Sequence, residues 1–139
     1  MTLYVILALI TFTGSRKREA QRVLGDIIVR ENEYKEILSA LLGLLNEGVH
    51  IVAGQGTSIF YNSVMARMEQ MEPADVVDRR FEDAFSHMDL ESSTIYRALQ
   101  AGASTVNQPQ RYINASGKYI HTINTTIPVK DADGKLLAV

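Results

Sequence analysis

The chain has 139 residues, of which 46% are hydrophobic, and it carries a formal net charge of −2. This length suits one domain, because domains cluster near ~100–150 residues. The small net charge gives no electrostatic reason to expect nucleic acid or an anionic membrane as the main partner. The sequence has no cysteine, which excludes disulfides and thiolate chemistry and is typical of a cytoplasmic protein. The histidines at positions 50, 87 and 121 lack metal-ligand spacing, so we expect no metal site.

The first segment, residues 1–15, contains an apolar run over 3–12 that is followed by basic residues at 16–18. A membrane-spanning helix needs roughly 20 apolar residues, and the run lacks the basic start and cleavage site of a signal peptide. Three interpretations stay open. The segment is a strand that pairs with another edge or chain, a leader without a native role, or the end of a truncated membrane span.

The next segment, residues 16–46, has no proline and repeats apolar residues with helical spacing. With Leu24 at heptad position a, seven of the eight a and d positions are apolar, and Glu31 is the exception. We therefore expect an amphipathic helix about 45 Å long. A helix that lies on its own domain is the alternative to one that pairs with a second copy. The residues expected to mediate homodimerisation are Leu24, Ile27, Tyr34, Leu38, Leu41 and Leu45.

Residues 47–139 show a mixed pattern of short strands and short helices. Strands are predicted over 49–53 and 57–61, on either side of a glycine-rich turn. A helix is then predicted over 63–71, with Asn62 as its N-cap. These elements indicate a β-hairpin followed by a capped helix.

The rest of the chain contains short helices and then three strands. A helix that begins at Ser92 or Ser93 is predicted to end at Gly102. The remaining predictions are helical turns over 73–90, strands near 105–113, 119–129 and 136–139, and turns at 114–117 and 131–134. The whole order predicts an α+β fold. We expect a five-stranded antiparallel sheet with short helices on one face, preceded by the long N-terminal helix.

Several local strings resemble a PAS domain. Residues 46–52 and 59–62 are similar to the first hairpin of that family, whose second strand ends in a Tyr-Asn pair that caps the next helix. Residues 131–135 resemble the turn before its last strand. Residues 120–129 resemble the Thr-x-Asn-(Ser/Thr)-Thr-x-Pro string of N-terminal sensory PAS domains in NtrC-type, sigma-54-dependent activators, with the regulators of arginine utilisation as the nearest group. The resemblance covers about residues 37–139.

The resemblance implies a sensory domain of a bacterial transcriptional regulator. Such a domain binds a small metabolite, mediates dimerisation, or does both, and so controls a separate output module. The sequence contains no Gly-x-x-x-x-Gly-Lys motif, helix-turn-helix or kinase transmitter, so we expect an excised sensory domain. Two alternatives stay open. They are a PAS domain of a membrane-tethered sensor histidine kinase and a structural dimerisation module without a ligand.

A PAS fold implies a pocket between the concave sheet and the short helices. Alternation along the strand at 119–129 puts Thr122 and Asn124 on a polar face, and Ile123 and Ile127 on the opposite face. If the polar face lines the pocket, it can bind a small polar ligand such as an amino acid. If it faces solvent, the isoleucines form the core, and both arrangements stay open. The candidate ligand-binding residues are Tyr61, Tyr96, Asn107, Tyr112, Thr122 and Asn124.

Other side chains offer weaker signals. Tyr96 either contacts the ligand or fills the core, and Arg97 and Arg111 are candidates to pair with a ligand carboxylate. His87, followed by Met88, lies near the place where haem-binding PAS domains supply an axial ligand, although a lone histidine in a short helix is more often structural or exposed. We expect no cofactor. The sequence shows no nucleophile–base arrangement, so we also expect no enzymatic activity. From the small net charge and the short apolar run we expect no direct nucleic-acid contact and no membrane association.

Overall fold

The computed structural model describes residues 14–139, and the apolar run at residues 3–12, with its three open interpretations, lies outside this range. The chain divides into two compact units, Met1–Leu44 and Leu45–Val139, which are described separately below. Within the described residues, no helix combines the length and the apolar character that crossing a membrane requires.

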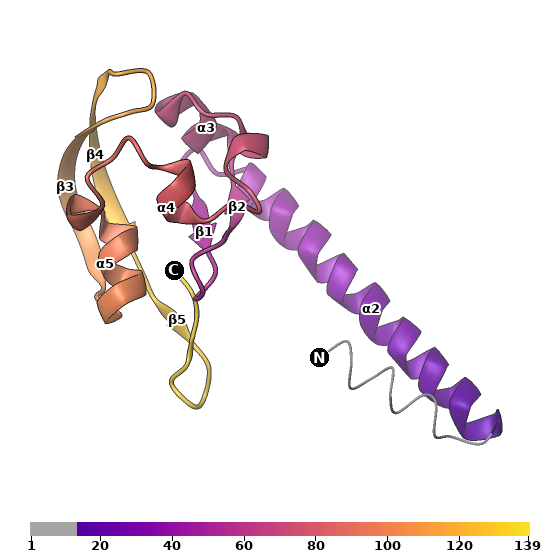
Figure 1. Ribbon diagram of the computed structural model, residues 1–139. Helices are drawn as coiled ribbons and strands as arrows, with labels where there is room; N and C mark the ends of the chain where they lie inside the picture. The colour runs from indigo at the N-terminus through magenta and orange to yellow at the C-terminus, as the bar shows by residue number, and fades with distance from the viewer. Residues whose placement is uncertain (1–13) are drawn as a thin grey trace. The chain divides into compact units, whose positions relative to one another are not determined.

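The first unit contains one long helix, α2, which spans Gly14–Gly43 (Figure 1). The expected N-terminal helix is thus confirmed, but it ends three residues before the predicted boundary at 46. Glycine lowers helix stability by about 1 kcal/mol relative to alanine, and Gly43 is the last helical residue. As a correction, Leu45 lies beyond the helix and is not part of its heptad repeat. Several remaining a and d side chains are largely exposed, with Tyr34 at 71% and Leu41 at 58%.

The second unit begins with the hairpin of β1 (His50–Val52) and β2 (Ser58–Tyr61). The two strands are antiparallel, with His50 opposite Tyr61. They are shorter than predicted. The N–H of Ala53 still donates to the carbonyl of Thr57 at 2.8 Å, but both residues lie outside the two strands, in isolated bridges to other segments. Ala53 forms a bridge to Ala138, and Thr57 forms one to Arg80.

Asn62 connects this hairpin to α3, which spans Ser63–Glu69. Its Oδ1 accepts hydrogen bonds from the backbone N–H of Met65 at 3.0 Å and of Val49 at 3.1 Å. Its Nδ2 donates to the carbonyl of Glu47 at 2.9 Å. The predicted cap is confirmed, and the same side chain also holds the segment that leads into β1.

Short helices follow. They are η1 (Pro73–Asp75), α4 (Phe81–Ala84), η2 (Leu90–Ser92) and α5 (Thr94–Ala101). Ser93 caps α5 by accepting a hydrogen bond from the N–H of Tyr96, and Gly102 ends the helix with φ 63°. The range predicted for this helix is therefore confirmed.

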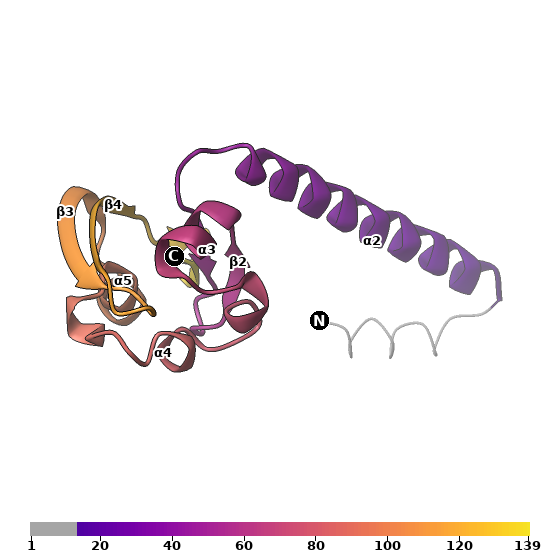
Figure 2. The same ribbon diagram turned by 90° about the horizontal axis from the view of Figure 1, so that it is seen from above.

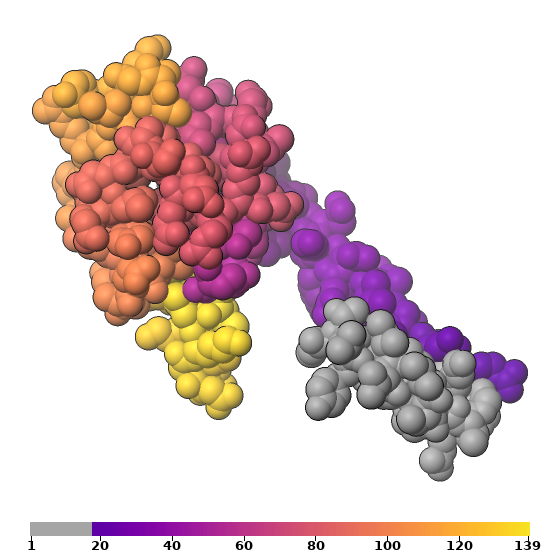
Figure 3. Space-filling model, viewed as in Figure 1, coloured from indigo at the N-terminus to yellow at the C-terminus, as the bar shows by residue number. Residues whose placement is uncertain are grey.

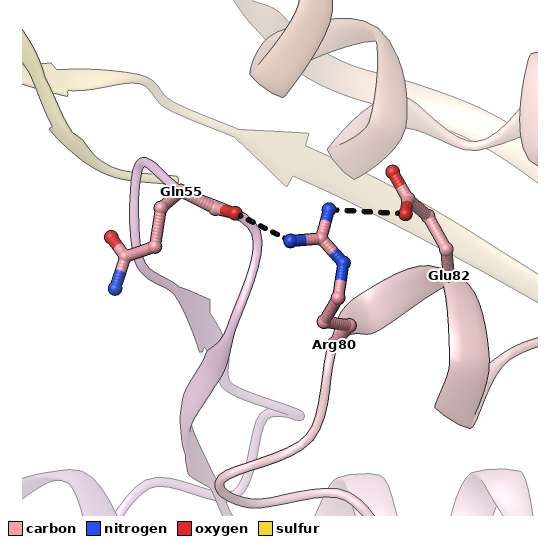
Figure 4. Close-up of polar contacts among 3 residues, drawn as sticks. All are labelled: Gln55, Arg80 and Glu82. Carbon is pink, nitrogen blue, oxygen red and sulfur yellow. Dashed lines mark hydrogen bonds and ion pairs between the residues drawn. The ribbon is translucent and has the colours of Figure 1, made fainter.

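Arg80 joins the start of α4 to the turn between β1 and β2 (Figure 4). Its Nη1 donates to the carbonyl of Gln55 at 3.2 Å, and its Nη2 contacts Oε2 of Glu82 at 3.1 Å. The N–H of Phe81 also donates to the carbonyl of Gly56 at 2.8 Å. These bonds fix α4 against the hairpin.

The C-terminal part forms four strands, β3 (Thr105–Ile113), β4 (Tyr119–Thr126), β5 (Val129–Lys130) and β6 (Leu136–Ala138). The prediction of one strand over 119–129 is wrong in one respect, because the ladder is interrupted at Ile127 and Pro128. Proline has no backbone N–H to donate, so it breaks the ladder.

The strands pair as three hairpins, β1–β2, β3–β4 and β5–β6. Two hydrogen bonds between Val52 and Val139, of 2.9 and 2.8 Å, place β6 beside β1. Gly54 allows this approach, since a Cβ there would lie 2.2 Å from the carbonyl oxygen of Leu136. The order is β2-β1-β6-β5, and β4 with its partner β3 continues from β5. Counting β4 and β5 as one interrupted strand, this is the predicted five-stranded antiparallel arrangement.

The core lies where the first hairpin meets the helices. Its buried members are Val52, Tyr61, Val76, Phe81 and Phe85. Figures 1 and 2 show α5 beside β3 and β4. A buried hydrogen bond of 2.7 Å between the hydroxyls of Thr126 and Thr94 joins them.

The turn between β3 and β4 lies against α3 (Figure 3). Buried Asn114 makes this connection, because its Nδ2 donates to the carbonyl of Met68 at 2.9 Å. Its Oδ1 accepts hydrogen bonds from the N–H groups of Ser116 and Lys118 within the turn. The far end of the β3–β4 hairpin is thereby held over the helices.

Candidate functional site

A cavity with a volume of about 690 Å³ lies between the strands and the short helices. This volume falls within the range of about 300–1,000 Å³ typical of small-molecule sites. Its lining comes from β1, α3, α4, α5, β3, β4 and β5, together with the end of β6 and the residues just before β1. The cavity therefore occupies the place that the PAS resemblance implies for a pocket.

The polar face of β4 lines this cavity. Thr122 and Asn124 are partly buried and belong to its wall, whereas the residue between them, Ile123, borders the cavity but is 73% exposed. The alternative with the polar face in solvent is therefore wrong. Thr122 donates to Oδ1 of Asn124 at 2.9 Å, and Nδ2 of Asn124 donates to Gln110 on β3. These side chains form a row of hydroxyl and amide groups along the wall.

The six predicted ligand-binding residues do not lie together. Tyr112, Thr122, Asn124 and Asn107 line the cavity, but Tyr61 and Tyr96 are not among its lining residues. Tyr61 is buried in the core and its hydroxyl donates to the carbonyl of Met65 at 3.3 Å. Tyr96 packs against the same core, so its position favours the role of filling the core over that of contacting a ligand.

Asn107 holds an irregular place in β3. Its φ is 49°, and the register with β4 shifts between Thr105 and Gln108. Its N–H donates to Oγ1 of Thr125 at 3.1 Å. Asparagine tolerates the left-handed region better than most residues, which suits a β-bulge at the margin of the cavity.

The basic residues and His87 lie elsewhere. Arg97 and Arg111 are both exposed and do not line the cavity. The guanidinium of Arg111 instead stacks over the ring of Tyr119 at 4.3 Å. His87 is exposed and is not in the cavity wall, although its neighbour Met88 is. The positions of these two arginines give no support for recognition of a ligand carboxylate.

A buried acid in the cavity wall was not anticipated from the sequence. Glu69, at the end of α3, is only 2% exposed, and the hydroxyl of Tyr112 donates to its Oε1. Its other oxygen, Oε2, is buried and has no hydrogen-bond partner. Burial raises the pKa of Glu69, and the hydrogen bond from Tyr112 acts in the opposite direction. Glu69 lies four residues after Met65, so helical spacing puts both on one face, and that signal was present in the sequence.

His50 is the second titratable group in the wall that sequence reasoning missed. Its ring packs against Tyr61, Phe81 and Phe85, with centroid distances of 5.1, 5.8 and 5.4 Å. Its Nε2 lies 2.9 Å from Oγ of Ser58, whereas Nδ1 is buried without a partner. Burial lowers the pKa of His50 to about 4, so the ring is neutral at pH 7.

Comparison with known proteins gives one curated relative. The chain is 34% identical over 110 residues to the transcriptional activator RocR of Bacillus subtilis, and the match covers 78% of this chain and 24% of that protein. The chain thus spans about a quarter of the length of this relative. The likeness to PAS domains of transcriptional activators, which the string at residues 120–129 indicates, is confirmed by this match.

Solved structures share the fold. The E. coli DhaR(N)–DhaL complex contains a chain that matches with a TM-score of 0.70 at 18% identity, covering 88% of this chain and 40% of that chain. The PAS domain of Bordetella pertussis BvgS matches with a TM-score of 0.52 at 14% identity, covering 76% of this chain and 78% of that chain. These identities are low, so the structures establish the shared fold alone.

A family model described as a PAS domain matches residues 46–139. This range contains every element from β1 to β6 and all the residues that line the cavity. The chain therefore belongs to the PAS domain family.

Proposed function

We propose that the chain is the cytoplasmic sensory domain of a transcriptional activator and that it responds to a small polar ligand bound in the cavity. The observation that carries this proposal is a cavity of about 690 Å³ whose wall includes a hydrogen-bonded row of polar side chains, Gln110, Thr122 and Asn124, on β3 and β4. Polar side chains are rarely buried unless they form hydrogen bonds, so a polar row in a cavity wall suits a polar ligand. The similarity to RocR, named a transcriptional activator, favours this role over that of a sensor histidine kinase.

The cavity wall includes the segments through which a signal would leave the domain. Glu47 and Gly48, which precede β1, belong to the wall, as do Ala138 and Val139 at the C-terminal end. If the segment before β1 or the C-terminal segment changes its position, the contacts between these residues and the ligand change as well. The ligand therefore binds one arrangement of the two segments more tightly than another. Such a difference in affinity is what shifts a population between two states of an output module.

The test is a thermal-shift screen of small metabolites on the wild-type chain and on two phenylalanine variants. We expect at least one compound to raise the Tm of the wild type by about 5 °C at saturating concentration. Thr122→Phe fills the cavity from its wall and should abolish this shift. His121→Phe is the matched control, because His121 lies next to Thr122 on β4, is exposed and is not among the residues that line the cavity.

Two results would count against a ligand-binding domain. One is that no compound stabilises the wild type. The other is that Thr122→Phe responds as strongly as His121→Phe. Either result favours a structural module whose cavity has no ligand.

We also propose that α2 forms a homodimer through its heptad positions. Ile27, Tyr34, Leu38 and Leu41 occupy a or d positions of the repeat and are between 48% and 71% exposed. An apolar seam of this kind, interrupted at Glu31, is typical of a coiled coil, in which a second copy covers it. The second copy is the occupant that fits best, because the seam repeats with the spacing that an identical helix requires.

The double variant Leu38→Asp, Leu41→Asp should convert the dimer into a monomer in sedimentation velocity. It places charged groups in the seam, and we expect the dimer dissociation constant to rise at least about tenfold. The control is Val29→Asp, Ala40→Asp, whose side chains are exposed at heptad positions f and c and should leave the dimer intact. A dimer that persists in the Leu38, Leu41 variant would exclude α2 as the interface.

A further inference from the structure

Within residues 14–139, no positively charged group pairs with the carboxylate of Glu69. Its Oε1 accepts a hydrogen bond from Tyr112, its Oε2 is buried without any partner, and the residue is 2% exposed. Isolating a carboxylate from water is costly unless a cation or several donors compensate it. A group kept under such conditions in the wall of a cavity is a candidate for ligand recognition.

The charge of the cavity wall has one sign. Two charged residues, Glu47 and Glu69, are among its lining residues, and both are acidic. No lysine or arginine lines the cavity within the described part of the chain, and Arg97 and Arg111 are exposed elsewhere. The wall therefore attracts cations, and it offers a ligand carboxylate no charged partner.

The rest of the wall suits the other parts of a small organic cation. Met65, Met68 and Phe85 supply apolar surface on the helical side. The row formed by Gln110, Thr122 and Asn124 supplies neutral hydrogen-bonding groups on the strand side. An alkyl chain with a cationic group at one end and a polar group at the other matches this distribution.

We propose that the cavity recognises an organic cation, an ammonium or guanidinium compound, and that the carboxylate of Glu69 is the group that binds its positive charge. Tyr112 is a positioning residue, because its hydroxyl donates to Oε1 and so fixes the orientation of the carboxylate. This inference rests on the proposed function, since it names the class of ligand that the sensory cavity takes.

Calorimetric titration with three four-carbon compounds tests the charge preference. The probes are 1,4-diaminobutane, 1,4-butanediol and succinate, which have similar lengths and carry positive, zero and negative charge, and 4-guanidinobutylamine adds the guanidinium form. We expect the two cations to bind at least about thirtyfold more tightly than the diol or succinate, since a buried charge pair accounts for this factor or more.

Variants then assign the effect to Glu69. Glu69→Gln should weaken binding of the cations at least about thirtyfold, and Tyr112→Phe should weaken it less, because the carboxylate remains. Glu72→Gln removes an exposed carboxylate just after α3 and should leave binding unchanged. The ligand-free melting temperature of Glu69→Gln should equal or exceed that of the wild type, which shows that the variant folds and separates ligand recognition from a structural role.

The outcomes separate this inference from the function on which it rests. If neither cation binds while neutral or anionic compounds of the metabolite screen do, the cavity binds ligands but the inference is wrong. Equal cation binding by Glu69→Gln and the wild type also overturns it. If no compound of any charge binds, the proposed ligand-binding function fails as well.

Discussion

Replacing Asn62 by alanine is expected to lower the free energy of unfolding by about 3 kcal/mol. The substitution removes the cap of α3 and also leaves the N–H of Val49 and the carbonyl of Glu47 without their partner. Loss of a cap costs about 1 kcal/mol, and loss of each of the two other partly buried hydrogen bonds adds about 1 kcal/mol. Chemical denaturation monitored by circular dichroism measures the change.

Asn62→Asp is the matched control. Its carboxylate still accepts from the N–H groups of Met65 and Val49 but cannot donate to the carbonyl of Glu47. We therefore expect a loss of about 1 kcal/mol. If the alanine variant is no less stable than the aspartate variant, the hydrogen bonds that Oδ1 of Asn62 accepts contribute nothing to the free energy of unfolding.

Acidification from pH 7 to pH 4 is expected to destabilise the domain by about 3 kcal/mol through His50 alone. Burial lowers the pKa of His50 from 6.5 to about 4 in the folded chain. Between these two values the unfolded state binds a proton that the folded state does not, so stability falls as the pH falls. The loss is complete below pH 4, and above pH 6.5 it is absent.

Glu69 acts in the opposite direction in the same experiment. Its raised pKa means that the folded state binds a proton more readily than the unfolded state, so acidification stabilises the fold through this group. The contribution of His50 is therefore taken as the difference between the wild type and His50→Gln. That variant should lose most of the acid dependence between pH 6.5 and 4, whereas His121→Gln, exposed on β4, should keep it. Parallel curves for the wild type and His50→Gln would contradict the buried, neutral state of His50.

The elements of the fold were largely predictable because their signals are local. Asn62 and Ser93 cap helices, Gly102 ends one, and the turn at 114–117 joins two strands, all as expected. Capping and turn formation involve residues within a few positions of one another, so neighbouring residues suffice to predict these roles, whereas the bonds from Asn62 to Glu47 and Val49 are not predictable in this way. The end of α2 at Gly43 was missed because the apolar repeat continues past that glycine to Leu45.

The cavity was less predictable because its polar groups come from distant parts of the chain. Alternation along β4 defines two faces, but the polar one is turned inward, against the usual rule that apolar side chains fill the interior. Glu69 and Tyr112, which share a hydrogen bond, are 43 residues apart in sequence. Spacing within single elements cannot reveal such a pair, because the fold alone brings α3 and β3 together.

Ligand occupancy is measured most directly by native mass spectrometry of the chain as purified from cells. A sensory cavity predicts one additional small mass on each subunit, retained by His121→Phe and absent from Thr122→Phe. The accurate mass of the released compound would then identify it and show whether it carries an ammonium or guanidinium group. A wild-type chain whose mass equals that of the bare polypeptide, and to which no metabolite binds on addition, would contradict the proposal that this PAS domain is a ligand sensor.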